Sequence, residues 1–99
     1  MSFKLISVKK SDKPNKKLVA TFENTKTKKT KKTYFGSAGM DDYTITKNKE
    51  QRDRYRKRHQ KDLKTNDPTR AGFLSYFILW GDSTSRQVNI KNYKKKFKL

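Results

Sequence analysis

Cysteine is absent from the 99 residues, and acidic residues are scarce. The lack of cysteine excludes disulfide bonds, thiol catalysis and cysteine-ligated zinc, and it is typical of a reducing compartment. Long apolar runs are also missing, since the longest, Ala71–Trp80, is about half the length that spans a bilayer. The stretch before Lys9 lacks the apolar core of a signal peptide, so we expect a protein that is not secreted and has no transmembrane segment.

Positive charge is what the sequence has in excess. Lysine and arginine total 27 against nine acidic residues, which gives a formal net charge of +18. Such a composition, with only 30% apolar residues, favours disorder when taken alone. The apolar residues are clustered, however, and the clusters are Phe3–Val8, Leu18–Phe22, Tyr34–Ile45 and Ala71–Trp80. We therefore expect one domain over residues 1–99 with a small core.

The first half of the chain predicts strands. Phe3–Val8 and Leu18–Phe22 mix β-branched and aromatic residues around a turn-rich connection, which predicts an antiparallel hairpin. Residues 24–33 contain five lysines and nothing to bury, so they form a flexible loop or a solvated hairpin tip. Thr33–Phe35 then returns as a third strand. Gly36 and Gly39 break the sheet in a tight turn with unusual backbone angles.

A first helix is predicted over residues 48–64. Asn48 caps it, and Gln51 at the third helical position completes a capping box. Tyr55, His59 and Leu63 recur every four residues and form a narrow apolar stripe.

Two further helices follow. Asp67 as cap and Pro68 at the first helical position predict a helix over 68–80, which is apolar nearly all round and therefore buried. Truncating Phe77 or Trp80 in it to alanine is expected to cost about 3–5 kcal/mol. Ser83 or Ser85 caps a helix over about 84–97, although the alternation at 88–90 leaves a strand open there. The expected fold is α+β, with a three-stranded antiparallel sheet packed on two or three helices.

Catalytic chemistry has little support in the sequence. The one histidine, His59, lies on the helical stripe and is expected at the edge of the core with one hydrogen bond. Asp41 and Asp42 are the only adjacent carboxylates, and they are expected to complete a turn. A lone histidine with scattered acids does not form a catalytic set, so we expect no enzyme, no metal and no cofactor.

Three basic segments predict a polyanionic partner, because uncompensated charges of one sign repel one another. They are the loop 24–33, the helix 49–64, whose arginines suit bidentate contact with phosphate or carboxylate, and the tail 91–99. The alternative is that these are ordinary solvated faces. Tyr34 and Phe35, beside the loop, are the candidates for stacking on bases. The candidate polyanion-binding residues are Lys26, Lys28, Lys29, Lys31, Lys32, Arg52, Arg54, Arg56, Lys57, Arg58, Lys61, Lys94, Lys95 and Lys96.

Several motifs between residues 34 and 97 resemble one family in their order. The elements are Tyr34-Phe35-Gly36-Ser37-Ala38-Gly39, Asp42-Tyr43-Thr44-Ile45, Arg52, Tyr55, Arg58-His59, Asp67-Pro68, Ala71-Gly72, Leu79-Trp80-Gly81 and Tyr93-Lys94-Lys95 with Phe97. This order resembles a family of short, uncharacterised basic proteins encoded by large nucleocytoplasmic DNA viruses of algae and amoebae. The family pattern often has an aromatic residue shortly before Asp-Pro, where this chain has Thr65-Asn66.

The resemblance implies a viral origin and a role in or around the virion. The expectation is a structural virion protein, a minor capsid or core component that bridges acidic capsid surfaces or the genome. It would act in the virion or in the host cytoplasm or nucleus. The composition leaves two alternatives open: a nucleic-acid-binding protein with little sequence preference for DNA or RNA, and a ribosome-associated protein. Oligomeric state does not follow from the sequence.

Overall fold

The computed structural model describes residues 3–99, and it begins with the predicted sheet. Strands β1 (Phe3–Lys10), β2 (Lys16–Asn24) and β3 (Thr30–Ser37) form an antiparallel sheet in the order β1-β2-β3. Alternate side chains of β2 are buried, beginning at Leu18, because successive residues of a strand point to opposite faces. The register between β1 and β2 shifts between Leu5 and Ser7. The expectation that no signal peptide precedes the domain rests partly on Met1 and Ser2, which lie outside the described residues.

The lysine-rich segment 24–33 is a hairpin tip, which is the second of the two forms expected for it, and it is not a flexible loop. The turn occupies only residues 25–29. The Asn24 side chain organises it, since its Oδ1 accepts hydrogen bonds from the backbone N–H groups of Lys26 and Thr27 at 2.9 and 3.1 Å. Lys28 takes a positive φ of 63° in the turn. Beyond the turn, Lys31 lies on β3, and its ammonium group donates to Thr69 Oγ1 at 3.0 Å.

The helical half begins with α1 (Tyr43–Thr46), which the sequence did not predict, and continues with α2 (Lys49–His59) and the 3-10 helix η1 (Gln60–Thr65). Asn48 caps α2 as predicted, because its Oδ1 accepts from the Gln51 N–H at 3.0 Å. The second half of the capping box is absent. The Gln51 side chain accepts instead from Thr46 Oγ1 at 2.8 Å.

The central helix begins later than predicted. It consists of α3 (Ala71–Leu74) and a π-helical turn, η2 (Ser75–Leu79), and the Trp80 N–H bonds Ser75 O at 3.1 Å. Residues 68–70 form a turn, so Pro68 is not the first helical residue. Its carbonyl oxygen accepts a hydrogen bond from the buried Tyr93 hydroxyl.

The last helix is α4 (Arg86–Lys96), which excludes the strand left open at 88–90. Of the two predicted caps, Ser85 is the one used, and its Oγ accepts from the Val88 N–H at 3.3 Å. Tyr93 is fully buried, whereas Ile90 and Phe97 pack against the core from its edge. After the helix, Leu99 O accepts a hydrogen bond from the Leu5 N–H at 3.1 Å. This bond joins the C-terminal residue to the edge strand β1.

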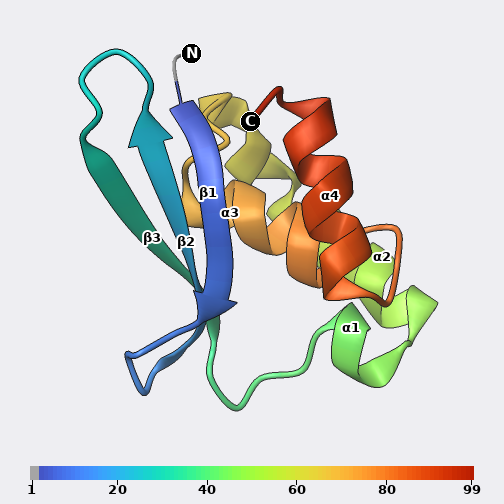
Figure 1. The fold of residues 1–99 in the computed structure, drawn as a ribbon. Coiled ribbons are helices and arrows are strands. Elements are labelled where there is room, and N and C mark those ends of the chain that lie inside the picture. The colour runs from blue at the N-terminus through green and yellow to red at the C-terminus, as the bar shows by residue number, and fades with distance from the viewer. Residues whose placement is uncertain (1–2) are drawn as a thin grey trace.

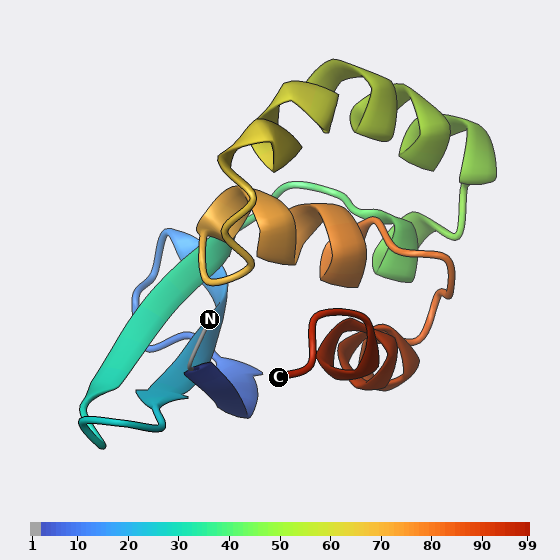
Figure 2. The ribbon, with the colours of Figure 1, turned by 90° about the horizontal axis from the view of Figure 1, so that it is seen from above.

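The sheet covers one side of α3 and η2, while α2 and α4 flank them on the other sides (Figures 1 and 2). The three-stranded sheet packed on helices confirms the predicted α+β class. Trp80 is buried with 7% of its surface exposed, but Phe77 lies at the edge of the core and is only partly buried. The core residues are Leu5, Leu18, Ala20, Phe22, Phe35, Phe73, Leu74, Ile78, Leu79, Trp80 and Tyr93. Within residues 3–99 no helix has the length and apolar character needed to cross a membrane.

Candidate polyanion interface

Most of the cationic side chains have no acidic partner among the residues that the structure describes. In residues 3–99, which contain all 27 lysines and arginines, only Lys17, Arg52, Arg56, Arg70 and Arg86 form an ion pair with a carboxylate. The other 22 do not. Their charge is therefore left for solvent, counterions or a partner.

Asp42 shows how completely one of the few carboxylates is used inside the fold. It is 1% exposed and accepts hydrogen bonds from Lys17 Nζ at 2.6 Å and from Arg86 Nη2 at 3.3 Å. It also caps α1, accepting from the Thr44 backbone N–H at 2.9 Å and from the Thr44 hydroxyl. Burial alone would raise the pKa of Asp42, but these hydrogen bonds and the charges of Lys17 and Arg86 outweigh it and lower the pKa below its ordinary value. The turn role expected for Asp41 and Asp42 falls to Asp42.

The outer face of α2 and η1 carries a row of unpaired cations, which we call the cationic stripe: Arg54, Lys57, Arg58, Lys61 and Lys64. All five are exposed. The first four are spaced by three and four residues, so they share one face of the helix. Lys61 and Lys64 are spaced by three in the 3-10 segment, where residues three apart are eclipsed.

A shallow hollow of about 610 Å³ opens on the cationic stripe. Four of its six lining side chains are cationic and none is acidic. The lining residues are Lys57, Arg58, Gln60, Lys61, Leu63 and Lys64. This surface can accept several phosphate or carboxylate groups at once.

Two arginines predicted for the interface point inward instead. Arg52 is 8% exposed, donates to Asp53 Oδ1 at 3.1 and 3.0 Å, and covers the Tyr43 ring. Arg56 donates to Trp80 O at 2.7 Å and to Asp82 Oδ1 at 3.0 Å. The sequence did contain the signal, because positions 52 and 56 lie on the same side of the helix as the apolar stripe through Tyr55.

The other predicted lysines are exposed, but they do not join the cationic stripe. The hairpin group is Lys26, Lys28 and Lys29 at the turn with Lys31 and Lys32 on β3, and the tail group is Lys94, Lys95 and Lys96. The hairpin turn and α2 lie on opposite sides of α3, and α4 lies apart from both (Figures 1 and 2). The candidate residues therefore form three separate cationic surfaces.

The two stacking candidates differ in accessibility. Phe35 is 1% exposed and belongs to the core, so its prediction as a stacking residue is wrong. Tyr34 is partly exposed, and its hydroxyl donates to Asp12 Oδ1 at 2.8 Å. That hydrogen bond raises the pKa of Tyr34 and lowers the pKa of Asp12. Lys13 Nζ lies 4.2 Å from the centre of the Tyr34 ring. The lysine therefore covers one face of this ring.

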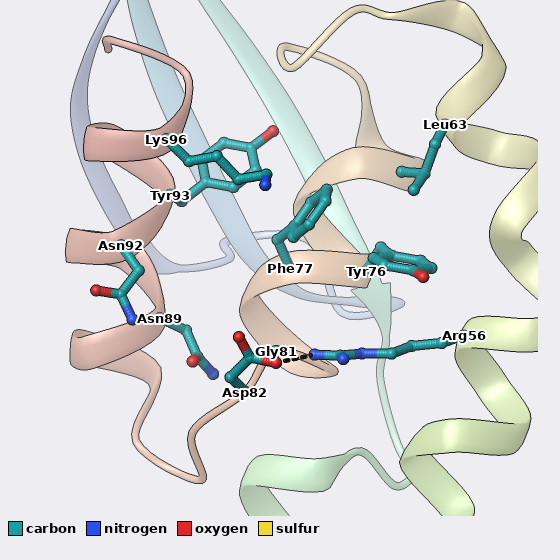
Figure 3. A pocket seen from close by; sticks show the side chains of 10 residues that line it. All are labelled: Arg56, Leu63, Tyr76, Phe77, Gly81, Asp82, Asn89, Asn92, Tyr93 and Lys96. Atoms are coloured by element: carbon teal, nitrogen blue, oxygen red, sulfur yellow. Dashed lines mark hydrogen bonds and ion pairs between the residues drawn. The ribbon is translucent and has the colours of Figure 1, made fainter.

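A second hollow, which we call the aromatic groove, was missed by the sequence reasoning. It has a volume of about 310 Å³ and lies between α2–η1 and α4, with Tyr76 and Phe77 among its lining residues (Figure 3). Arg56 lies over the Tyr76 ring at 5.7 Å, and Lys96 Nζ lies 5.7 Å from the centre of the Phe77 ring. Because residues 71–80 are apolar nearly all round, the pattern does not show which aromatic ring escapes burial.

His59 has the structural role expected from the sequence. Its ring stacks on Tyr55 at 4.1 Å, and its Nδ1 lies 3.1 Å from Asp62 Oδ2. Tyr55 in turn stacks on Trp80 at 4.3 Å, and burial raises the pKa of Tyr55 to about 12. The residues described by the structure contain no group of three or more His, Cys, Asp or Glu side chains able to hold a metal ion.

Comparison with known proteins places residues 6–59 in a family model described as "Family of unknown function (DUF5754)". No curated protein matches the chain. No solved structure matches it either. The matched range contains β1 from Ile6 onward, all of β2 and β3, and the helices α1 and α2.

Proposed function

The chain belongs to the DUF5754 family, whose function is unknown, and from that starting point we propose that the protein is a non-enzymatic polyanion-binding protein. Its principal partner in this proposal is a nucleic acid, bound through phosphate contacts with little sequence preference. The observation that carries the proposal is the cationic stripe, where exposed cations gather without an acidic residue in the hollow beside them.

The internal use of the carboxylates supports this function. Asp42, Asp53 and Asp82 each neutralise an arginine or lysine within the fold, and Arg52 and Arg56 are thereby withdrawn from the surface. What remains outside is a field of one sign, which attracts a polyanion and accelerates its association. Lysine and arginine that neutralise phosphates also release condensed counterions, which is the main source of sequence-independent affinity.

The proposal is tested by the salt dependence of DNA binding. Wild-type protein is expected to bind duplex DNA with log affinity falling linearly with log salt, with a slope of about −0.9 per phosphate contacted. The variant Lys57→Ala, Arg58→Ala, Lys61→Ala removes three charges from the cationic stripe and should reduce the magnitude of that slope by about 2.7 if each side chain neutralises one phosphate.

A matched control removes three charges elsewhere. Lys4, Lys9 and Lys10 on β1 are exposed and lie outside the stripe, so their replacement by alanine should leave the slope close to that of wild type. An equal reduction of the slope in both triple variants would contradict a localised interface. An affinity that does not change between 20 mM and 300 mM salt would remove nucleic acid as the partner.

A second candidate function is the bridging role of a virion protein, a minor capsid or core component that joins acidic capsid surfaces to one another or to the genome. It is favoured by the position of the hairpin lysines and the cationic stripe on opposite sides of α3, since a bridge needs two separate contact surfaces (Figure 1). The viral setting comes from the sequence resemblance.

The virion proposal has its own measurement. Mass spectrometry of purified particles should detect the protein, and its absence would contradict this role. After nuclease treatment, a protein that bridges capsid surfaces should still co-purify with capsid protein, whereas one held only by the genome should be released.

A further inference from the structure

The aromatic groove combines three features that suit an unpaired base. Its rings come from Tyr76 and Phe77, which are only partly buried. Every nucleic-acid base has a π-face that stacks on such rings, so this contact does not depend on the nucleotide sequence. Lys96 on α4 is exposed and forms no ion pair within residues 3–99, so its ammonium group is available to a phosphate. Asn92, also on α4, lines the groove (Figure 3).

The two polar walls differ in how many hydrogen bonds hold them. Arg56 is fixed at one side, because Trp80 O and Asp82 hold its guanidinium group. Lys96 is held at the other side only by contacts over the Phe77 and Phe97 rings. A base that enters the groove can therefore take the place of the Lys96 ammonium over Phe77, while the lysine turns to the phosphate. The side-chain amide of Asn92 makes no hydrogen bond to other described residues, so it is available to the edge of the base.

We propose that the aromatic groove binds one unpaired base of a single-stranded nucleic acid. The base stacks on Phe77 and contacts the Tyr76 ring at an angle, because the two rings are inclined by 59°. The Asn92 side chain hydrogen-bonds the edge of the base, and Lys96 binds the adjacent phosphate. This proposal rests on the proposed function and adds to it a preference for single strands. It also gives the molecule a base contact on the far side of α2 from the cationic stripe.

Size and charge select this occupant. The volume of about 310 Å³ is at the lower end of the range for small-ligand pockets, so the groove suits a single nucleotide unit. A base within a duplex is stacked and paired and is not available to it. Arg56 neutralises Asp82, the one acidic residue in the lining, which leaves Lys96 as the net charge of the groove. An anionic aromatic ligand therefore fits better than an apolar peptide segment.

The test compares two single strands of the same length and charge, a 12-nucleotide strand with bases and an abasic strand with the same backbone. We expect wild-type protein to bind the base-bearing strand about tenfold more tightly at equal salt, since stacking of one base on an aromatic side chain has an effect of this order. Tyr76→Leu and Phe77→Leu keep apolar volume but remove the rings, and each should reduce this preference while leaving affinity for the abasic strand unchanged. A strand carrying 2-aminopurine should show quenching with wild-type protein that the leucine variants lose.

Matched variants separate the groove from other aromatic and amide groups. Tyr43 also lies under a guanidinium group, that of Arg52, but it is outside the groove, so Tyr43→Leu should retain the preference. Asn92→Ala should reduce the preference, whereas Gln87→Ala, on the exposed surface of α4, should not. Thermal unfolding checks that each variant is folded. If Phe77→Leu does not fold, Tyr76→Leu still tests the groove.

The outcomes distinguish this inference from the function on which it rests. Equal affinity for the base-bearing and abasic strands would overturn the groove as a base site and leave phosphate binding intact. Loss of the preference in Tyr34→Leu but not in the groove variants would place the stacking at the hairpin and also overturn it. Failure of both strands to bind at low salt would reject the proposed function itself. A free mononucleotide that binds as tightly as the 12-nucleotide strand would identify the ligand as a nucleotide and overturn the single-strand proposal.

Discussion

Asp42 is the residue whose charge state matters most to this fold. Its carboxylate joins β2, α1 and α4 through Lys17, Thr44 and Arg86. Removing one partner of a fully buried ion pair costs about 3–5 kcal/mol. Arg86 keeps 35% of its side chain exposed, so the pair with Arg86 is partly screened by solvent. We expect Asp42→Asn to destabilise the protein by about 2–3 kcal/mol at pH 7.

The pH dependence follows from the direction of the pKa shift. Because the folded-state pKa of Asp42 is lowered, its contribution to stability is present above the unfolded-state pKa, near 3.9, and is lost as pH falls through the folded-state value. Urea unfolding of wild type and Asp42→Asn at pH 7 and below pH 4 measures this directly. The difference between the two proteins should shrink in acid, and a difference that is constant with pH would contradict the assignment.

Gly36 and Gly39 form a natural pair for comparison, since they have φ angles of +78° and +81°. A Cβ at Gly36 would lie 2.7 Å from Leu79 Cδ1, whereas one at Gly39 would meet nothing within 4 Å. Leu79 is buried and has little room to move. Gly39→Ala should cost about 1–2 kcal/mol from backbone strain alone, and Gly36→Ala about 2–5 kcal/mol because overpacking adds to it. Denaturant unfolding of both variants checks the order, and equal losses would show that Leu79 yields freely.

Among the helices, the contact between α2 and the central helix depends on ring stacking. Trp80 stacks on Tyr55 with an interplanar angle of 8° and is 7% exposed, whereas Phe77 is only partly buried at the groove. We therefore expect Trp80→Ala to cost about 3–5 kcal/mol and Phe77→Ala about 2 kcal/mol, below the value that the sequence predicts for it. Calorimetric or urea unfolding of the two variants measures the difference, and a larger loss for Phe77→Ala would contradict the burial described here.

Elements with a strong local signal could be predicted from the sequence. Two of these signals are periodic: the alternation in β2 and the helical face shared by Ile90, Tyr93 and Phe97. The third is the Asn48 cap, which depends only on residues next to it in the chain. The sequence could not decide between a flexible loop and a hairpin tip over 24–33, because the order of this segment comes from the Asn24 side chain and from pairing with β2. The late start of α3 was also hidden, since the Pro68 carbonyl serves Tyr93, which is 25 residues away in the chain.

The same limit explains the mixed result for the candidate site. Charge excess is readable from composition, and Arg54, Lys57, Arg58 and Lys61 are exposed as expected. The helical period places Arg56 on the inner side of α2, but its pairing with Asp82 does not follow from that period, and the exposed face of Phe77 depends on how far α4 covers η2. Neither relation is local in sequence.

For the whole molecule, the unpaired cations predict a stability that increases with salt. Self-repulsion of a net charge of +18 opposes the compact state, and counterions screen it over a Debye length of about 10 Å at 0.1 M salt. We expect the urea midpoint at pH 7 to rise between 20 mM and 300 mM sodium chloride. Replacing Lys10, Lys26 and Lys29, all exposed, by glutamine should make that rise smaller. A midpoint that falls with salt would show that the internal ion pairs outweigh the repulsion.

The stack of His59, Tyr55 and Trp80 has an optical consequence. Trp80 is the only tryptophan, and its indole ring rests on a tyrosine from α2. Its fluorescence therefore reports whether α2 is docked on the central helix. The strands contain no tryptophan and contribute no tryptophan signal. Separation of α2 from the central helix can then be followed in time without labelling, and independently of any opening of the strands.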